Sequence, residues 1–179
     1  MLRPIKPTEN PFLSLASSII SQQISTKAAQ SILGRFLALF GRRKPSPALL
    51  LGLTDTELRS AGLSSSKVVY MRDLARRFLD KTIEPKKFPK MTDEEIIEHL
   101  TAVKGIGVWT AHMFLIFALN RPNVLPVGDL AIKKAFQKAF NLRKLPSEKK
   151  MYELAHAHEG RWTELSLYLW ELVDPVLDK

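Results

Sequence analysis

Apolar side chains recur three or four residues apart along most of this chain of 179 residues, which is the spacing of amphipathic helices. No segment alternates polar and apolar residues over a convincing length, as a half-buried strand would. The helical pattern runs through Phe12–Ile20, Ala29–Phe40, Val68–Phe78, Ile96–Leu100, Ile132–Phe140 and Trp162–Val173. The sequence therefore predicts an all-α fold.

Capping residues mark where several of these helices begin. Thr54 precedes Glu57 by three residues, and Thr92 precedes Glu95 in the same way. This spacing lets a threonine and a glutamate satisfy each other's backbone N–H groups at a helix start. Asn10 before a proline marks a third start. We expect a helix to follow each of these positions.

The stretch over residues 100–135 organises the rest of the chain. It holds the turn Lys104-Gly105-Ile106-Gly107, followed by an almost wholly apolar helix over 108–119. A helix that is apolar on nearly every side is expected at the centre of a fold. Glycines accept positive φ and let a ligand approach the backbone, and the free N–H groups at a helix start suit a phosphate. The turn is therefore a candidate anion-binding site.

Charge and composition narrow the function. The chain has 27 Lys and Arg against 18 Asp and Glu, and its formal charge of +9 favours a polyanionic partner. The absence of cysteine excludes disulfides, thiol catalysis, cysteine-ligated zinc and iron–sulfur clusters. The sequence starts without a signal-like apolar core, and its longest apolar run is too short to span a membrane. We expect a monomer without a membrane partner, cytoplasmic and nucleoid-associated if prokaryotic.

Four short segments form a combined signature. In chain order they are Ser18–Ala29, Gly62–Ser64 with Lys67, Lys104–Ala111 (KGIGVWTA) and Leu125–Lys133 (LPVGDLAIK). Together they resemble the helix-hairpin-helix DNA glycosylases, specifically the 3-methyladenine DNA glycosylase II branch. The resemblance extends over residues 10–173.

The resemblance implies a two-lobed helical bundle with a helix-hairpin-helix motif and a substrate cleft between the lobes. We expect one catalytic domain over 1–179, with roughly 25–118 as one lobe and 1–24 with 119–179 as the other. The implied activity is hydrolysis of the N-glycosidic bond of alkylated bases in double-stranded DNA, such as 3-methyladenine or 7-methylguanine, after the nucleotide is flipped out. The alternatives are a glycosylase for an oxidised or deaminated base, or a non-catalytic module that binds distorted DNA.

Asp129 has two interpretations. An aspartate before an amphipathic helix is a common N-cap, and the spacing alone favours that role. The resemblance places Asp129 at the family's catalytic aspartate, with Gly128 before it as expected. The two roles are compatible, because a helix N-terminus stabilises a carboxylate anion. That anion would stabilise the oxocarbenium-like sugar and orient or deprotonate the attacking water.

Trp109 stands where bifunctional relatives carry the lysine that forms a Schiff base, so the resemblance implies a monofunctional enzyme that leaves an abasic site. Its spacing with Met113 and Phe117 is typical of a core stripe, whereas the resemblance places Trp109 at the mouth of the base pocket, where its ring would attract a cationic base. Phe117 is expected in the core. Trp109, Met113 and Trp162 are the candidate pocket residues, and Trp162 lies in the segment Gly160–Thr163, where the chain departs from the family pattern.

The resemblance also implies how DNA and a cation would bind. Gln22 and Gln23 belong to a tract, with Ser25, that enters the minor groove in the family, and Gln23 best matches the side chain that fills the gap left by the flipped base. The hairpin would hold a phosphate through Lys104, Gly105, Gly107 and the Thr110 hydroxyl. No organic cofactor is expected. A structural Na⁺ or K⁺ would be bound by the carbonyls of Thr101, Val103 and Ile106.

Overall fold

The computed structural model describes residues 6–173, and these residues form helices without any strand. In chain order the elements are α1 (Pro11–Ser21), α2 (Thr26–Ala38), α3 (Pro47–Gly52), α4 (Asp55–Ser60), α5 (Ser65–Leu79), η1 (Pro85–Lys90), α6 (Asp93–Thr101), α7 (Val108–Met113), η2 (Phe114–Ala118), α8 (Leu130–Ala139), α9 (Glu148–Ala155), η3 (His156–His158) and α10 (Trp162–Val173). The predicted all-α fold is confirmed. Within the described range, no helix is both long and apolar enough for a transmembrane segment.

The helices group into two compact units. One unit is Thr8–Ala111, and the other is the described part of 1–7 and 112–179. The expected division, 25–118 against 1–24 with 119–179, differs because α1 packs against α2 and α5 and so belongs to the first unit. Residues 1–5 and 174–179 of the predicted domain lie outside the described residues.

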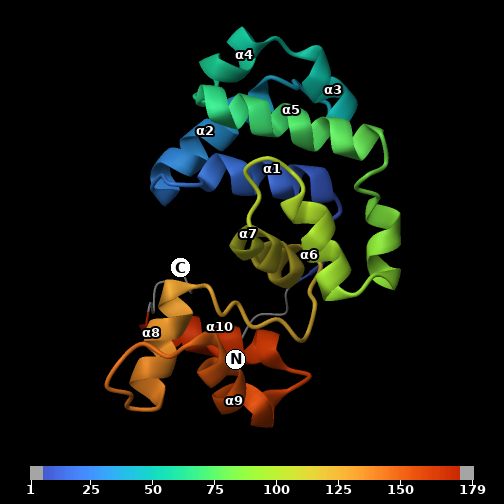
Figure 1. The fold of residues 1–179 in the computed structure, drawn as a ribbon. Coiled ribbons are helices and arrows are strands. Elements are labelled where there is room, and N and C mark those ends of the chain that lie inside the picture. Colours follow the sequence, from blue (N-terminus) through green and yellow to red (C-terminus); the bar gives the residue numbers. More distant parts are fainter. Residues whose placement is uncertain (1–5, 174–179) are drawn as a thin grey trace. The chain divides into compact units, whose positions relative to one another are not determined.

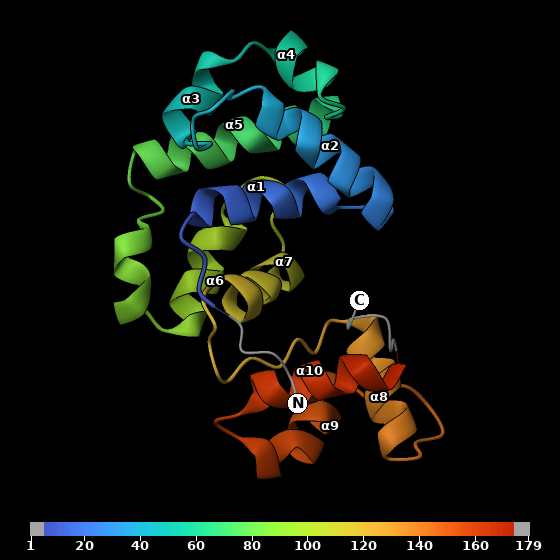
Figure 2. The ribbon, with the colours of Figure 1, turned by 180° about the vertical axis from the view of Figure 1, so that it is seen from behind.

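Helix α5 is the central element of the unit Thr8–Ala111. It packs against α3 and α4 on one side and against α1 on the other, as both ribbon views show (Figures 1 and 2). Its buried side chains lie at helical spacing, and helices α2, α3 and α4 contribute further core residues. The buried set includes Phe36, Leu50, Leu58, Val68, Met71, Leu74 and Ala75. The apolar stripes therefore produce the expected core.

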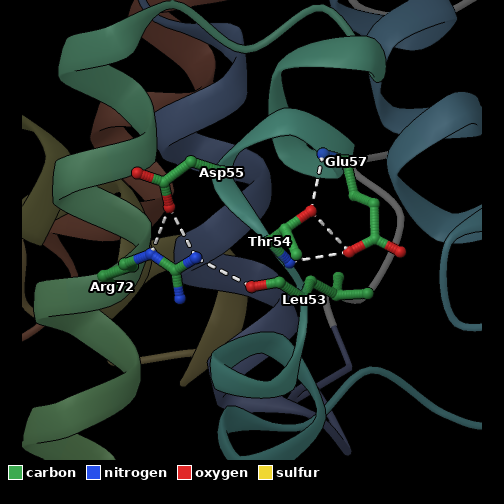
Figure 3. A network of polar contacts seen from close by, with 5 residues as sticks. All are labelled: Leu53, Thr54, Asp55, Glu57 and Arg72. Carbon is green, nitrogen blue, oxygen red and sulfur yellow. Dashed lines mark hydrogen bonds and ion pairs between the residues drawn. The ribbon is translucent and has the colours of Figure 1, made fainter.

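A polar network fixes α4 against α5 (Figure 3). Thr54 and Glu57 form the predicted capping box at the start of α4. Arg72 of α5 donates from Nε to Asp55, at 2.7 Å, and from Nη2 to the carbonyl oxygen of Leu53, also at 2.7 Å. The second predicted capping box, Thr92 with Glu95, starts α6. Both capping predictions are confirmed.

The second unit is built on the packing of α8 against α10, which lie side by side in both ribbon views (Figures 1 and 2). Ile132 and Phe136 of α8 are buried, as the stripe predicted, and Ala135 of α8 and Leu169 of α10 are buried as well. Ala139, which the stripe also placed inward, is exposed at the end of the helix. Phe140 stacks on Phe136 but remains 45% exposed, at the end of the stripe.

The apolar helix predicted over 108–119 forms over 108–118, but its second half is a π-helix. The N–H of Leu119 donates to the carbonyl oxygen of Phe114, five residues back, at 3.1 Å. A π turn holds one residue more than an α turn, so it changes which side chains share a face. Phe117 is consequently 47% exposed, and its predicted place in the core is wrong.

Candidate active site and DNA-binding segments

The predicted hairpin turn lies between α6 and α7. The N–H of Ile106 donates to the carbonyl oxygen of Val103 at 3.1 Å, which closes the turn. Gly105 has a φ of +80°, and a Cβ at this position would overlap the ring of Tyr70. Gly107 lacks a positive φ, and a Cβ there would meet no atom within 4 Å. The fold therefore requires glycine at position 105 but not at 107.

The hairpin is anchored to α5 through Asp73. The Lys104 N–H donates to Asp73 Oδ2 at 2.9 Å, and Arg77 Nε donates to the same oxygen at 3.1 Å. Burial acts to raise the pKa of Asp73, but these two hydrogen bonds and the charges of Arg77 and Lys104 act together to lower it below its ordinary value. The Asp73 carboxylate is thus a charged anchor that fixes the turn.

The surface of the hairpin consists mainly of backbone. Lys104, Gly105 and Gly107 are exposed. Thr110 is buried, with 4% of its surface exposed, so the predicted contact between its hydroxyl and DNA does not fit the structure. Thr110 lies in the first turn of α7, and its side chain faces the interior of the protein. The backbone N–H groups of the exposed residues Gly105 and Gly107 and the Lys104 side chain remain as candidate phosphate ligands.

The tract between α1 and α2 lies against this hairpin. Gln22 Nε2 donates to the carbonyl oxygen of Gly105 at 2.8 Å. Gln23 is exposed and has a left-handed backbone with a φ of +59°. Ser25 is the N-cap of α2, where its side chain accepts from the Ala28 N–H at 3.3 Å. Of the two glutamines, Gln22 binds within the protein and Gln23 points to its surface.

Asp129 is the N-cap of α8, as the spacing predicted. Its Oδ1 accepts from the Ile132 N–H at 2.9 Å, and only 9% of the residue is exposed. Trp170 Nε1 of α10 lies 3.4 Å from the same oxygen and forms a long hydrogen bond with it. A carboxylate that is mostly buried, at a positive helix end and beside an indole N–H, is held in one orientation.

An aromatic pair stands next to this carboxylate. Trp170 is 8% exposed and stacks on Phe117 of η2, with ring centroids 5.9 Å apart and an angle of 26° between the planes. Phe117 exposes about half of its surface, so the pair is accessible from solvent through this residue. Sequence reasoning placed Phe117 in the core and considered Trp170 only as a further aromatic candidate, without linking it to Asp129.

The other candidate pocket residues lie in different surroundings. Trp162 donates its indole N–H to the Ala155 carbonyl oxygen at 3.0 Å and packs on Tyr152, so it is held by α9. Trp109 is 49% exposed, which excludes the alternative that it is a core residue. Met113 is partly buried.

Buried hydroxyls of α10 hold the loop that leads to Asp129. Thr163 Oγ1 accepts from the Val124 N–H at 3.1 Å and donates to the Arg121 carbonyl oxygen at 2.5 Å. Ser166 Oγ lies 3.0 Å from the Val124 carbonyl oxygen. The segment Gly160–Thr163, which departs from the family pattern, therefore supports the loop that positions Asp129. A periodicity argument cannot detect these contacts, because they join residues about forty positions apart.

Known proteins resemble this chain over most of its length. Residues 16–158 match the family described as the HhH-GPD superfamily base excision DNA repair protein. The chain is 34% identical to the DNA-3-methyladenine glycosylase 1 of Schizosaccharomyces pombe over 175 residues, which covers 94% of this chain and 76% of that protein. It is 43% identical to the DNA-3-methyladenine glycosylase of Saccharomyces cerevisiae over 138 residues, covering 73% of this chain but only 47% of the relative.

A solved structure agrees with the fold. The Schizosaccharomyces pombe 3-methyladenine DNA glycosylase in complex with abasic DNA superposes with a TM-score of 0.77 at 31% sequence identity. The superposition covers 94% of this chain and 85% of that one. The similarity therefore includes both compact units.

Proposed function

The chain belongs to the HhH-GPD superfamily of base excision DNA repair proteins, and we propose that it is a monofunctional DNA glycosylase that excises alkylated bases from double-stranded DNA. The observation that carries this proposal is the Asp129 carboxylate, buried at the start of α8 and hydrogen-bonded by Trp170. The names of the relatives at 34% and 43% identity support alkylated bases as the substrate class.

The chemistry follows from the leaving group. A purine alkylated at N3 or N7 carries a positive charge on its ring. When the bond between its N9 and the sugar C1′ breaks, the electron pair goes to the base, and the base leaves as a neutral molecule. The sugar becomes oxocarbenium-like, and the Asp129 anion stabilises that charge. Water then adds to C1′ and loses a proton, for which the same carboxylate is the acceptor. The products are a free base and an abasic site.

The substrate reaches this carboxylate only after its nucleotide leaves the duplex, because a stacked base hides the glycosidic bond. Within the unit that contains Asp129, the pair Trp170–Phe117 offers an aromatic surface to a cationic base. Trp109 occupies the position of the Schiff-base lysine in bifunctional relatives. Strand cleavage through that lysine is therefore not part of the proposed reaction.

In the proposed complex, the hairpin and the tract around Gln23 bind the DNA. The exposed amides at Gly105 and Gly107 and the Lys104 side chain bind a backbone phosphate, and Gln23 enters the minor groove. The formal charge of +9 supports a phosphate-dominated interaction. The affinity for DNA should therefore fall linearly on a plot of log affinity against log salt concentration.

The carbonyls of Thr101, Val103 and Ile106 are proposed to bind Na⁺ or K⁺. Thr101 ends α6 and Val103 follows shortly after, so these two carbonyls lie at the negative end of a helix, which favours a cation, and Ile106 lies in the hairpin turn that follows. Oxygen donors without charge suit a monovalent, hard ion. The bound ion would add positive charge at the hairpin and strengthen its contact with phosphate. If so, the affinity for duplex DNA at constant ionic strength should be higher in potassium or sodium chloride than in the chloride of a bulky organic cation.

The experiment that tests the substrate class uses duplex DNA treated with a methylating agent. Chromatography of the soluble fraction should detect free 3-methyladenine or 7-methylguanine, and the DNA should remain uncut until alkali cleaves the abasic sites. If no methylated base is released, duplexes that carry an oxidised or a deaminated base are tested in the same way, and release from one of those would assign another lesion. Binding to damaged DNA without release of any base would support a non-catalytic module and overturn the proposal.

A further inference from the structure

Lys67 is placed unusually for a lysine. It lies in the first turn of α5, where the positive end of the helix disfavours a cation. Its Nζ donates to the carbonyl oxygens of Ile20, at 2.7 Å, and Gln22, at 2.9 Å. These carbonyls belong to the C-terminal end of α1, which is a negative helix end. The ammonium is partly buried, and this desolvation lowers its pKa. The position of Lys67 is therefore explained by its contacts with the end of α1 and not by any stabilisation of α5.

What Lys67 holds is a backbone in an uncommon conformation. Gln23 follows directly after the Gln22 carbonyl and has a φ of +59°. Residues other than glycine, asparagine and aspartate rarely adopt this left-handed backbone conformation, because their Cβ approaches the following carbonyl oxygen. Such strain persists only where surrounding contacts fix it, and it gathers at functional sites. The exposed Gln23 side chain is therefore presented by a conformation that the neighbouring contacts enforce.

The same side of α5 also holds the hairpin. Lys67, Tyr70 and Asp73 follow one another at intervals of three residues along α5. The Tyr70 ring lies beneath Gly105, and Asp73 accepts from the Lys104 N–H at 2.9 Å. The Gln22 side chain joins the tract directly to the hairpin by donating to the Gly105 carbonyl oxygen at 2.8 Å. One helix thus sets the spacing between the tract and the hairpin.

We propose that Lys67 is a positioning residue that fixes the backbone at Gln22 and Gln23, so that the tract and the hairpin meet DNA as one rigid surface. The inference rests on the proposed function, in which Gln23 enters the duplex once a nucleotide is extruded. A tract that is already ordered in the free protein avoids the entropy cost of ordering on DNA. Lys67 therefore promotes the extruded state more than it promotes contact with undamaged DNA.

The test separates these two effects. Lys67→Met keeps the aliphatic stem but removes the N–H donors. We expect the single-turnover release of 7-methylguanine at saturating protein to slow about tenfold, the loss typical of hydrogen bonds to a charged group. Lys67→Arg, which restores cationic donors, should recover most of the rate. The affinity for undamaged duplex should change little, because the phosphate contacts of the hairpin remain.

Arg35 offers the matched control. It lies in the same unit, and its Nε donates to the carbonyl oxygen of Ala61, the C-cap of α4, at 2.9 Å. Arg35→Met therefore removes a cation that also binds a helix end, without touching the tract. This variant should lose thermal stability and some general DNA affinity, yet release bases at nearly the wild-type rate. If Lys67→Met fails to fold, Lys67→Gln, whose shorter and neutral side chain ends in an amide, replaces it in the same comparison.

The outcomes are distinguishable. If the wild type releases methylated bases and Lys67→Met releases them as fast, or no more slowly than Arg35→Met, the positioning role is refuted and the proposed function stands. If Lys67→Arg is as slow as Lys67→Met, the donors are not what matters and the inference also fails. If the wild type releases no base, the proposed function fails and this inference fails with it.

Discussion

The indole N–H of Trp170 is directed at the carboxylate of Asp129, with Nε1 3.4 Å from Oδ1. This bond joins α10 to Asp129, the N-cap of α8, which lies 41 positions earlier in the sequence. It gives Asp129 a second donor besides the Ile132 N–H. The two donors fix one carboxylate oxygen, so the orientation of the whole carboxylate depends on both helices.

Trp170→Phe should separate the ring from its N–H. The phenyl ring preserves most of the packing on Phe117, so the fold should survive, but the carboxylate loses one donor. We expect base release under single-turnover conditions to slow about threefold to tenfold, since the bond is long. Trp162→Phe provides the comparison: its N–H is donated to Ala155, so this change should lower thermal stability and slow release less. Equal rates for Trp170→Phe and wild type would contradict a role for this contact.

The two hairpin glycines should respond differently to alanine. Gly105→Ala should destabilise the protein by about 1–3 kcal/mol, because a left-handed φ and the ring of Tyr70 both oppose a Cβ. Gly107→Ala should leave the stability within about 1 kcal/mol of wild type, since no atom lies near the added methyl group. Thermal or urea unfolding measures both.

DNA affinity completes the comparison of the glycines. A methyl group at position 107 stands where a phosphate would approach the backbone, so Gly107→Ala should weaken duplex binding about tenfold, one lost phosphate contact. Unchanged affinity in a folded Gly107→Ala protein would show that phosphate does not bind at this amide.

His112 should make stability depend on pH. Burial lowers its pKa, and the charge of Glu148 opposes that shift only in part. The folded protein therefore binds the proton less readily than the unfolded chain, whose histidine has a pKa of about 6.5. As the pH falls below that value, the unfolded state takes up the proton first and the free energy of unfolding decreases, until the pH passes the lowered pKa.

Urea unfolding at several pH values measures this dependence. His112→Gln should flatten the curve below about pH 6.5, and His156→Gln, at an exposed position, is the matched control that should retain it. A wild-type curve that stays level through this range would contradict the proposed effect of burial.

Much of this architecture could be predicted from local pattern. The stripe through Phe36 and the capping boxes at Thr54 and Thr92 involve residues a few positions apart, so their spacing determines the result. The N-cap role of Asp129 is local in the same sense. Such features need no knowledge of how distant segments meet.

Contacts between distant segments could not be predicted. The periodicity of α10 marks an apolar face but does not say that Trp170 meets Asp129. The prediction for Phe117 was wrong because the π-helical turn changes which side chains after Met113 share a helix face. The local sequence does not indicate such a turn. The expected lobe boundary at 24–25 failed for a similar reason: the partners of α1 are set by tertiary packing.

The central claim is that the Asp129 carboxylate performs the chemistry, and Asp129→Asn tests it most directly. Asparagine is as good an N-cap as aspartate, so the variant should keep its fold and its affinity for DNA. The measurement is the single-turnover release of 7-methylguanine from methylated duplex DNA, with circular dichroism and duplex binding as controls. The account predicts a rate at least about a hundredfold below that of the wild type, the loss typical of a group that acts directly on the transition state. Release at the wild-type rate by a folded Asp129→Asn protein would contradict it.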